Sequence, residues 1–149
     1  MPIRTEFKIT IDRPAEEVWN FMFDLKNVPK WDPGVVEARQ TSAGPLERVG
    51  ATIQTFSEGG RDRGTARVAE FEMYRKLVLT FVEEAKGPLR QAKLTYTFEP
   101  DGNHTTLTRV VEAEIVGFWK LIQPYISYLV NKDSRAEAAN IRALFPPRS

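Results

Sequence analysis

The 149-residue chain contains no cysteine and only one histidine, His104. Without cysteine there is no disulfide framework, no thiolate metal site and no cysteine nucleophile. One histidine cannot form a multi-histidine metal site, and we expect neither a metal nor a cofactor. His104 lies beside an Asp101-Gly102 turn signal, so an exposed loop histidine is favoured over a catalytic base.

The chain also lacks an excess of charge and a long apolar run. Its 21 basic and 20 acidic residues leave a formal net charge of +1, which argues against nucleic-acid binding. No stretch approaches the ~20 apolar residues of a membrane span, and the charged N-terminus does not resemble a signal peptide. We therefore expect residues 1–149 to form a single domain that is soluble, cytoplasmic and without an integral membrane span.

Hydropathy and turn residues predict an α+β protein. Residues 3–11 alternate with a period of two, as in a half-buried strand. Asp12, Pro14 and the acids after them predict a capped helix start, and Pro33-Gly34 ends a second short helix. Six strands joined by hairpin turns follow, at 35–41, 51–57, 64–73, 77–84, 90–99 and 105–115. The last element, 118–145, is a long helix in which Pro124 predicts a kink or a second start. This order indicates an antiparallel sheet with helices packed on one face.

Three segments carry a resemblance to a known family: residues 9–19 (ITIDRPAEEVW), 31–33 (WDP) and 96–102 (YTFEPDG), the last followed by TTLT at 105–108. The sequence resembles the START-like (SRPBCC) superfamily, in its polyketide cyclase/dehydrase and lipid-transport branch. The resemblance implies a helix-grip fold, in which a curved seven-stranded sheet wraps the long C-terminal helix around a hydrophobic cavity. Members include lipid carriers, ligand sensors and cyclases, so the fold alone does not decide the function.

Strand register predicts which side chains face the interior. A turn centred on Asp101-Gly102 pairs Phe98 with Thr105 and Leu94 with Arg109. Turns at 74–76 and 86–88 place Arg67, Glu83 and Arg90 in one row and pair Leu79 with Leu94. The predicted concave face is mostly apolar and consists of Phe71, Leu77, Leu79, Phe81, Leu94, Tyr96, Phe98, Leu107 and Val111.

Four charged residues fall on that apolar face, where an unpaired charge costs several kcal/mol. Arg67, Glu83 and Arg90 can form a cross-strand triad, although a solvated cluster at the end of the sheet is preferred. Arg109 has no carboxylate opposite it. Its partner is then a polar residue of the long helix (Asp133 or Ser134), water, or the acidic group of a ligand. A β-bulge that turns Arg109 outward is the alternative.

The function predicted from these features is ligand binding. Ser127, Ser134 and Asn140 interrupt the apolar stripe of the long helix, as expected beside a cavity, although a ragged amphipathic helix explains them almost as well. We expect a carrier or sensor for a small hydrophobic or amphipathic ligand, lipid- or polyketide-like. The alternative is an enzyme resembling the polyketide cyclase/aromatases, in which Arg109, Tyr96 and water assist proton transfer. The candidate ligand-binding residues are Arg109, Tyr96, Phe71, Leu79, Phe81, Leu94, Phe98, Trp31, Arg67, Glu83 and Arg90.

Overall fold

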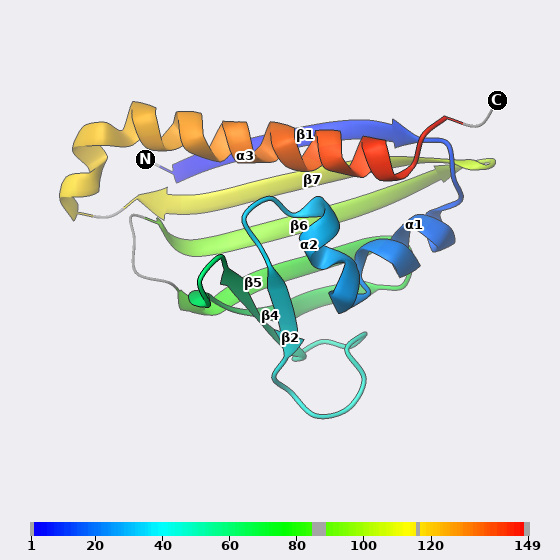
Figure 1. Cartoon of the computed structure of the whole chain (residues 1–149), viewed down its shortest axis with the longest axis horizontal. Helices are drawn as coiled ribbons and strands as arrows, with labels where there is room; N and C mark the ends of the chain where they lie inside the picture. The colour runs from blue at the N-terminus through cyan, green and yellow to red at the C-terminus, as the bar shows by residue number, and fades with distance from the viewer. Residues whose placement is uncertain (1, 85–88, 116, 148–149) are drawn as a thin grey trace.

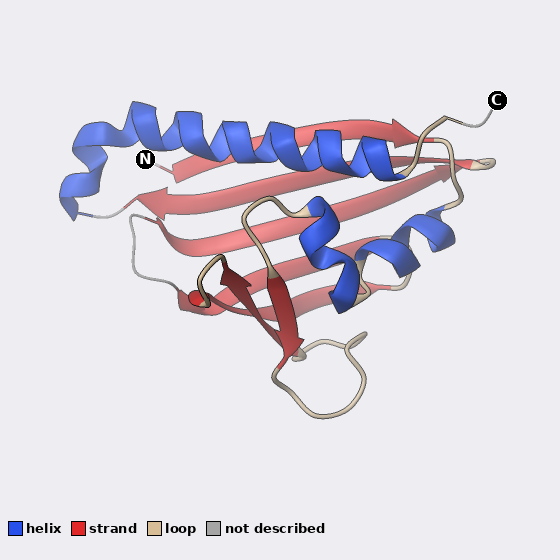
Figure 2. Ribbon diagram, in the orientation of Figure 1, coloured by secondary structure: helices blue, strands red, loops and turns tan. Residues whose placement is uncertain are grey.

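A computed structural model describes residues 2–84, 89–115 and 117–147 of the chain. Its elements are β1 (Pro2–Ile11), α1 (Ala15–Met22), η1 (Leu25–Asn27), α2 (Val28–Trp31), β2 (Glu37–Gln40), β3 (Thr52–Ser57), β4 (Arg61–Glu72), β5 (Lys76–Glu84), β6 (Leu89–Asp101), β7 (His104–Ile115), η2 (Gly117–Ile122) and α3 (Gln123–Leu144). All neighbouring strands pair antiparallel, in the order β1-β7-β6-β5-β4-β3-β2. The helices lie along one face of this sheet (Figures 1 and 2). The predicted α+β architecture is confirmed.

The long C-terminal segment consists of two successive helices. Of the two alternatives at Pro124, a kink or a second helix start, the structure shows the second start. A 3-10 helix, η2, ends at Ile122, and Pro124 occupies the first turn of α3. Proline is tolerated there because the amide it lacks has no partner within the helix. Within the described part of the chain, no helix is long and apolar enough to cross a membrane.

The hairpin between β6 and β7 differs from the predicted register by two residues. Asp101 pairs with His104, so Gly102 and Asn103 form the turn. Gly102 has a φ of 62°, the left-handed value that a type II′ hairpin needs at its first central residue. Tyr96 therefore lies opposite Arg109, not opposite Leu107. A slip of two residues changes every partner but leaves each side chain on its predicted face.

The predicted row of Arg67, Glu83 and Arg90 is wrong. One bulge in β4 and one in β5 shift the pairing, so that Arg67 lies opposite Thr80 and Glu83 opposite Thr65. Arg67 is exposed between two buried, inward-facing neighbours and thus belongs to the outer face. The Glu83 side chain and the 86–88 turn lie outside the described residues. The predicted pairing of Leu79 with Leu94 between β5 and β6 is confirmed.

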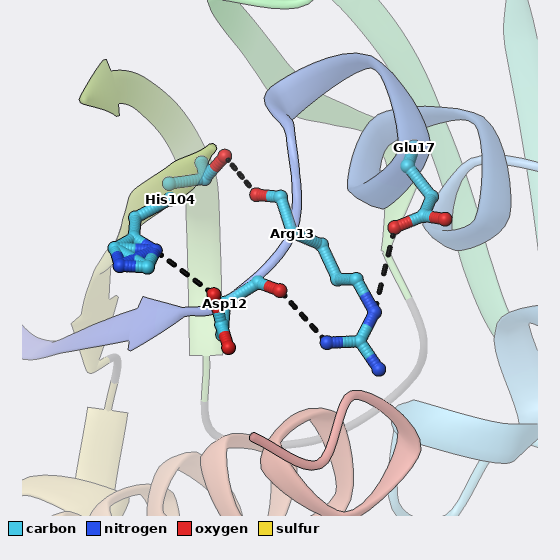
Figure 3. A network of polar contacts seen from close by, with 5 residues as sticks. Asp12, Arg13, Glu17 and His104 are labelled. Atoms are coloured by element: carbon cyan, nitrogen blue, oxygen red, sulfur yellow. Dashed lines mark hydrogen bonds and ion pairs between the residues drawn. The ribbon is translucent and has the colours of Figure 1, made fainter. Parts of the chain in front are cut away.

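The corner between β1 and α1 is held by backbone and side-chain contacts rather than by the predicted Asp12 cap (Figure 3). The helix begins after Pro14, which makes no side-chain capping bond. The Asp12 carboxylate lies 3.0 Å from Nδ1 of His104 instead. The Thr105 hydroxyl donates to the Arg13 carbonyl at 2.8 Å, which fastens this corner to the start of β7. His104 is about half exposed, as predicted for a turn histidine.

Buried aromatic rings attach the short helices to the sheet. The ring of Trp19 in α1 meets those of Phe23 and Phe98 edge-on, with centroids 4.7 and 5.2 Å apart. Nε1 of Trp31 donates to the Met22 carbonyl at 2.9 Å, which folds α2 back against α1. The Asn140 side chain donates to the Trp31 carbonyl at 3.3 Å and so joins α3 to α2. These contacts hold α2 and α3 at a fixed spacing over the sheet.

Candidate functional site

A cavity of about 400 Å³ lies between the concave face of the sheet, the short helices and α3. Ligand sites in proteins commonly enclose about 300–1,000 Å³, with mostly apolar walls and a few polar groups. This cavity has that composition, because aromatic and aliphatic side chains of β4 to β6 face it together with Trp19 and Trp31. Among the predicted site residues, those that line it are Trp31, Phe71, Leu79, Phe81, Leu94, Tyr96 and Arg109.

The other predicted site residues occupy different positions. Phe98 is fully buried and packs against Trp19 and Phe23 in the core. Arg67 lies on the outer face. Arg90 pairs through its backbone with Glu114 near the end of the sheet and is not among the cavity-lining residues that the structure describes. The error at Arg67 came from the bulge in β4 between Val68 and Glu70, which breaks the two-residue alternation on which the predicted row depended.

Arg109 of β7 points into the cavity and meets Glu137 of α3. Nε of Arg109 lies 2.7 Å from Oε2 of Glu137, and the two side chains are 13% and 1% exposed. The pairing of β7 with β6 is regular through Arg109, so the outward bulge considered from the sequence is absent there. On its β1 side, the guanidinium lies 5.8 Å from the centre of the Phe7 ring. Arg109 therefore joins the sheet to the long helix.

This contact is an ion pair without hydrogen-bond geometry. Nε of Arg109 and both carboxylate oxygens of Glu137 lack a well-directed hydrogen-bond partner among the described residues. A guanidinium stays charged in proteins, so Arg109 cannot reduce its burial cost by losing a proton. Glu137 can reduce that cost by gaining one. Burial raises the pKa of Glu137 to about 8, while the charge of Arg109 opposes this rise.

Two further titratable groups belong to the same polar end of the cavity. Burial raises the pKa of Tyr96 well above 10, and the Glu137 charge adds to the rise, so Tyr96 is a neutral phenol at physiological pH. Burial also raises the pKa of Asp32, which Arg63 and Arg109 oppose. This end of the cavity thus combines a permanent cation, a neutral hydroxyl and carboxyl groups that gain protons easily. Such a set can orient a polar group and hold or release a proton near neutral pH.

Sequence reasoning missed Glu137. It named Asp133 and Ser134 as candidate partners of Arg109, one helical turn too early. Ser134, Ala138 and Ile141 are all buried, and Glu137 lies on the same side of α3 at helical spacing from them. A carboxylate within a stripe of small and apolar residues was the available signal. Asp133 itself is exposed, although it also lines the cavity.

The family described as polyketide cyclase / dehydrase and lipid transport matches residues 2–146. The chain belongs to this family, which confirms the resemblance seen in the sequence.

Solved structures share the fold across nearly the whole chain. The Zhui aromatase/cyclase from Streptomyces sp. R1128 has a TM-score of 0.77 and 13% identity, over 95% of this chain and 92% of that chain. A START superfamily protein from Mycobacterium smegmatis has a TM-score of 0.75 and 13% identity, over 96% and 97%. A protein from Nitrosospira multiformis has a TM-score of 0.74 and 14% identity, over 96% of both chains. At these identities the likeness establishes the helix-grip fold alone. No curated protein matches the chain.

Proposed function

We propose that the chain is one ligand-binding domain that holds a small hydrophobic or amphipathic molecule, lipid- or polyketide-like, as a carrier or sensor. The observation that supports this most directly is the cavity of about 400 Å³, apolar along its walls and polar where Arg109 meets Glu137. Burial of a ligand's apolar surface there supplies the favourable free energy of binding, at roughly 25 cal/mol per Å². The polar end fixes the ligand's orientation. A cytoplasmic location stays a prediction.

Two measurements test this proposal. Native mass spectrometry of the purified protein should reveal a co-purifying small molecule that is lost on denaturation. Fatty acids, sterols and aromatic polyketides should be screened for thermal stabilisation, because a ligand that binds only the folded state raises apparent stability. Failure of every probe to bind, together with a ligand-free mass spectrum, would contradict the proposal.

An enzyme of the cyclase type is the second candidate, favoured by one observation. Glu137, with a pKa of about 8, lies beside a permanent cation in a cavity that a ligand carbonyl could share. In that arrangement Glu137 transfers a proton while Arg109 stabilises negative charge that develops on a carbonyl oxygen. Incubation with a poly-β-ketone separates the two candidates. A carrier returns the compound unchanged, whereas a cyclase converts it and loses that conversion in Glu137→Gln.

A further inference from the structure

The charges around the cavity are unevenly divided between basic and acidic groups. Among the described lining residues, the basic side chains are Arg109, inside the cavity, and Arg63, which is exposed. Arg63 reaches the Pro33 carbonyl at 3.4 Å, so it lies beside the end of α2 rather than deep in the cavity. Arg109 is thus the interior cation that a ligand anion could use. The acidic lining residues are Asp32, Glu47, Asp133 and Glu137.

Glu137 already occupies the position next to that cation. Its Oε2 lies 2.7 Å from Nε of Arg109, and its side chain is almost fully buried. A ligand carboxylate placed against Arg109 would therefore lie close to the Glu137 carboxylate. Like charges at that separation repel strongly where water is excluded. An amide, ketone or hydroxyl can accept from Arg109, or from the neutral hydroxyl of Tyr96, without this cost.

From this geometry, and resting on the proposed function, we propose that the cavity selects ligands with an uncharged, hydrogen-bonding polar end when Glu137 is ionised, and admits a carboxylate when Glu137 is protonated. We assign Glu137 as the residue that disfavours a carboxylate, because it occupies Arg109. With Glu137 ionised, the favoured ligand class is accordingly a lipid- or polyketide-like molecule ending in a carbonyl, amide or hydroxyl group rather than a free fatty acid.

The proton affinity of Glu137 makes the discrimination dependent on pH. When Glu137 is protonated, its charge no longer compensates that of Arg109, which can then accept a ligand anion. Above the pKa of Glu137, binding of a carboxylate is therefore accompanied by uptake of one proton from solution by Glu137, whereas binding of a neutral ligand is not. Since Glu137 titrates near 8, exclusion of acids is strongest above that pH. The charged and titratable groups that influence Glu137 come from four other elements or their ends as well as from α3: Arg109, Tyr96, Asp32, Arg63 and Asp133.

The experiment compares decanoate with decanamide, which have the same chain and nearly the same shape but differ in charge. Dissociation constants are measured by isothermal titration calorimetry at pH 7 and pH 9 for the wild type, Glu137→Gln and Glu112→Gln. Glu112 is exposed on β7 and does not line the cavity, so its variant makes the same chemical change away from the site. Circular dichroism verifies that each variant is folded.

For the wild type, we expect decanamide affinity to be unchanged between pH 7 and pH 9. Decanoate affinity should fall about tenfold, as the protonated fraction of a group titrating near 8 does. Glu137→Gln should bind decanoate at least tenfold more tightly than the wild type at pH 9 and remove its pH dependence. Glu112→Gln should behave as the wild type.

A wild-type decanoate affinity that is constant from pH 7 to pH 9, with decanamide still bound, would overturn this inference and leave the proposed function standing. The wild-type pH comparison remains decisive even if Glu137→Gln does not fold. A folded Glu137→Gln variant that keeps the wild-type preference for decanamide over decanoate at pH 9 would overturn the inference as well. Binding of neither probe to the wild type would instead count against both proposals.

Discussion

The buried Glu137 carboxyl predicts that this protein loses stability as the pH rises towards 8. In the unfolded chain the group titrates near 4.5, whereas burial in the folded protein raises its pKa to about 8. Between these values the folded state binds a proton that the unfolded state has released. Stability is linked to the difference in bound protons, so the contribution of Glu137 is fully present below pH 4.5 and declines up to pH 8.

The size of the effect follows from the two pKa values. Each pH unit inside this window costs about 1.4 kcal/mol, and the whole window about 5 kcal/mol. From pH 5.5 to 7.5 the wild type should lose between about 2 and 3 kcal/mol through Glu137. Asp32, whose pKa is also raised by burial, contributes in the same direction. The Glu137→Gln variant cannot take up this proton and should lose less stability over the same range.

Urea unfolding followed by tryptophan fluorescence, repeated from pH 5.5 to 7.5, measures this difference. Glu137→Gln should equal or exceed the wild type in stability at pH 7.5, because glutamine needs no proton to be buried. Glu112→Gln, at the exposed position on β7, is the matched control and should follow the wild-type profile. Parallel profiles for Glu137→Gln and the wild type would refute the reasoning. A large loss of stability in Glu137→Gln at pH 7.5 would instead identify Glu137 as an ionised partner that stabilises the fold.

Three further changes have defined outcomes. Arg109→Leu should destabilise the protein by roughly 3–5 kcal/mol at pH 9, because it leaves the buried Glu137 carboxylate without its cation, and by clearly less at pH 6. Equal losses of stability at the two pH values, measured by urea unfolding, would contradict this. Leu79→Trp should fill part of the cavity and weaken the binding of decanamide measured by calorimetry. Thr80→Trp, at the neighbouring outward-facing position, should leave decanamide binding unchanged. An equal change of affinity in both variants would show that the cavity is not the binding site. Gly102→Ala should lower the free energy of unfolding by about 1 kcal/mol, measured by thermal unfolding, because alanine is strained at a φ of 62°. Nothing lies within 4 Å of the added carbon, so no steric clash contributes. An unchanged stability would mean that the backbone of the turn relaxes.

From the sequence, the face of the sheet on which a side chain lies was easier to predict than the residue opposite it on the neighbouring strand. The hairpin between β6 and β7 shows why. Alternation with a period of two assigns Tyr96, Arg109 and Val111 to the concave face in any register that differs by an even number of residues. The turn residues alone had to fix the register, and both Asp101-Gly102 and Gly102-Asn103 are acceptable hairpin turns. In β4 even the face of each side chain was mispredicted beyond the bulge between Val68 and Glu70, because a bulge adds one residue to one strand. Arg67 moved to the outside for this reason.

The site was predictable on the sheet and only in part on the helix. Alternation was enough to place Arg109 inside and to show that it needed a partner from α3 or from a ligand. The identity of that partner depends on how α3 is rotated and how far it is displaced along its axis, and its polar interruptions left both open. A shift of one turn separates Asp133, which is exposed, from Glu137, which is buried.

The position of the ion pair also explains how a hollow interior can coexist with a stable fold. On α3 the cavity is lined by Val130, Asp133 and Glu137, whereas Ser134 and Ala138 are buried but do not line it. The core that compensates for this space is the aromatic cluster around Trp19 and Phe98, next to the short helices. Arg109 and Glu137 connect the sheet to the helix across the cavity. Because that connection consists of titratable groups, the cavity combines apolar walls with a polar end whose charge depends on pH.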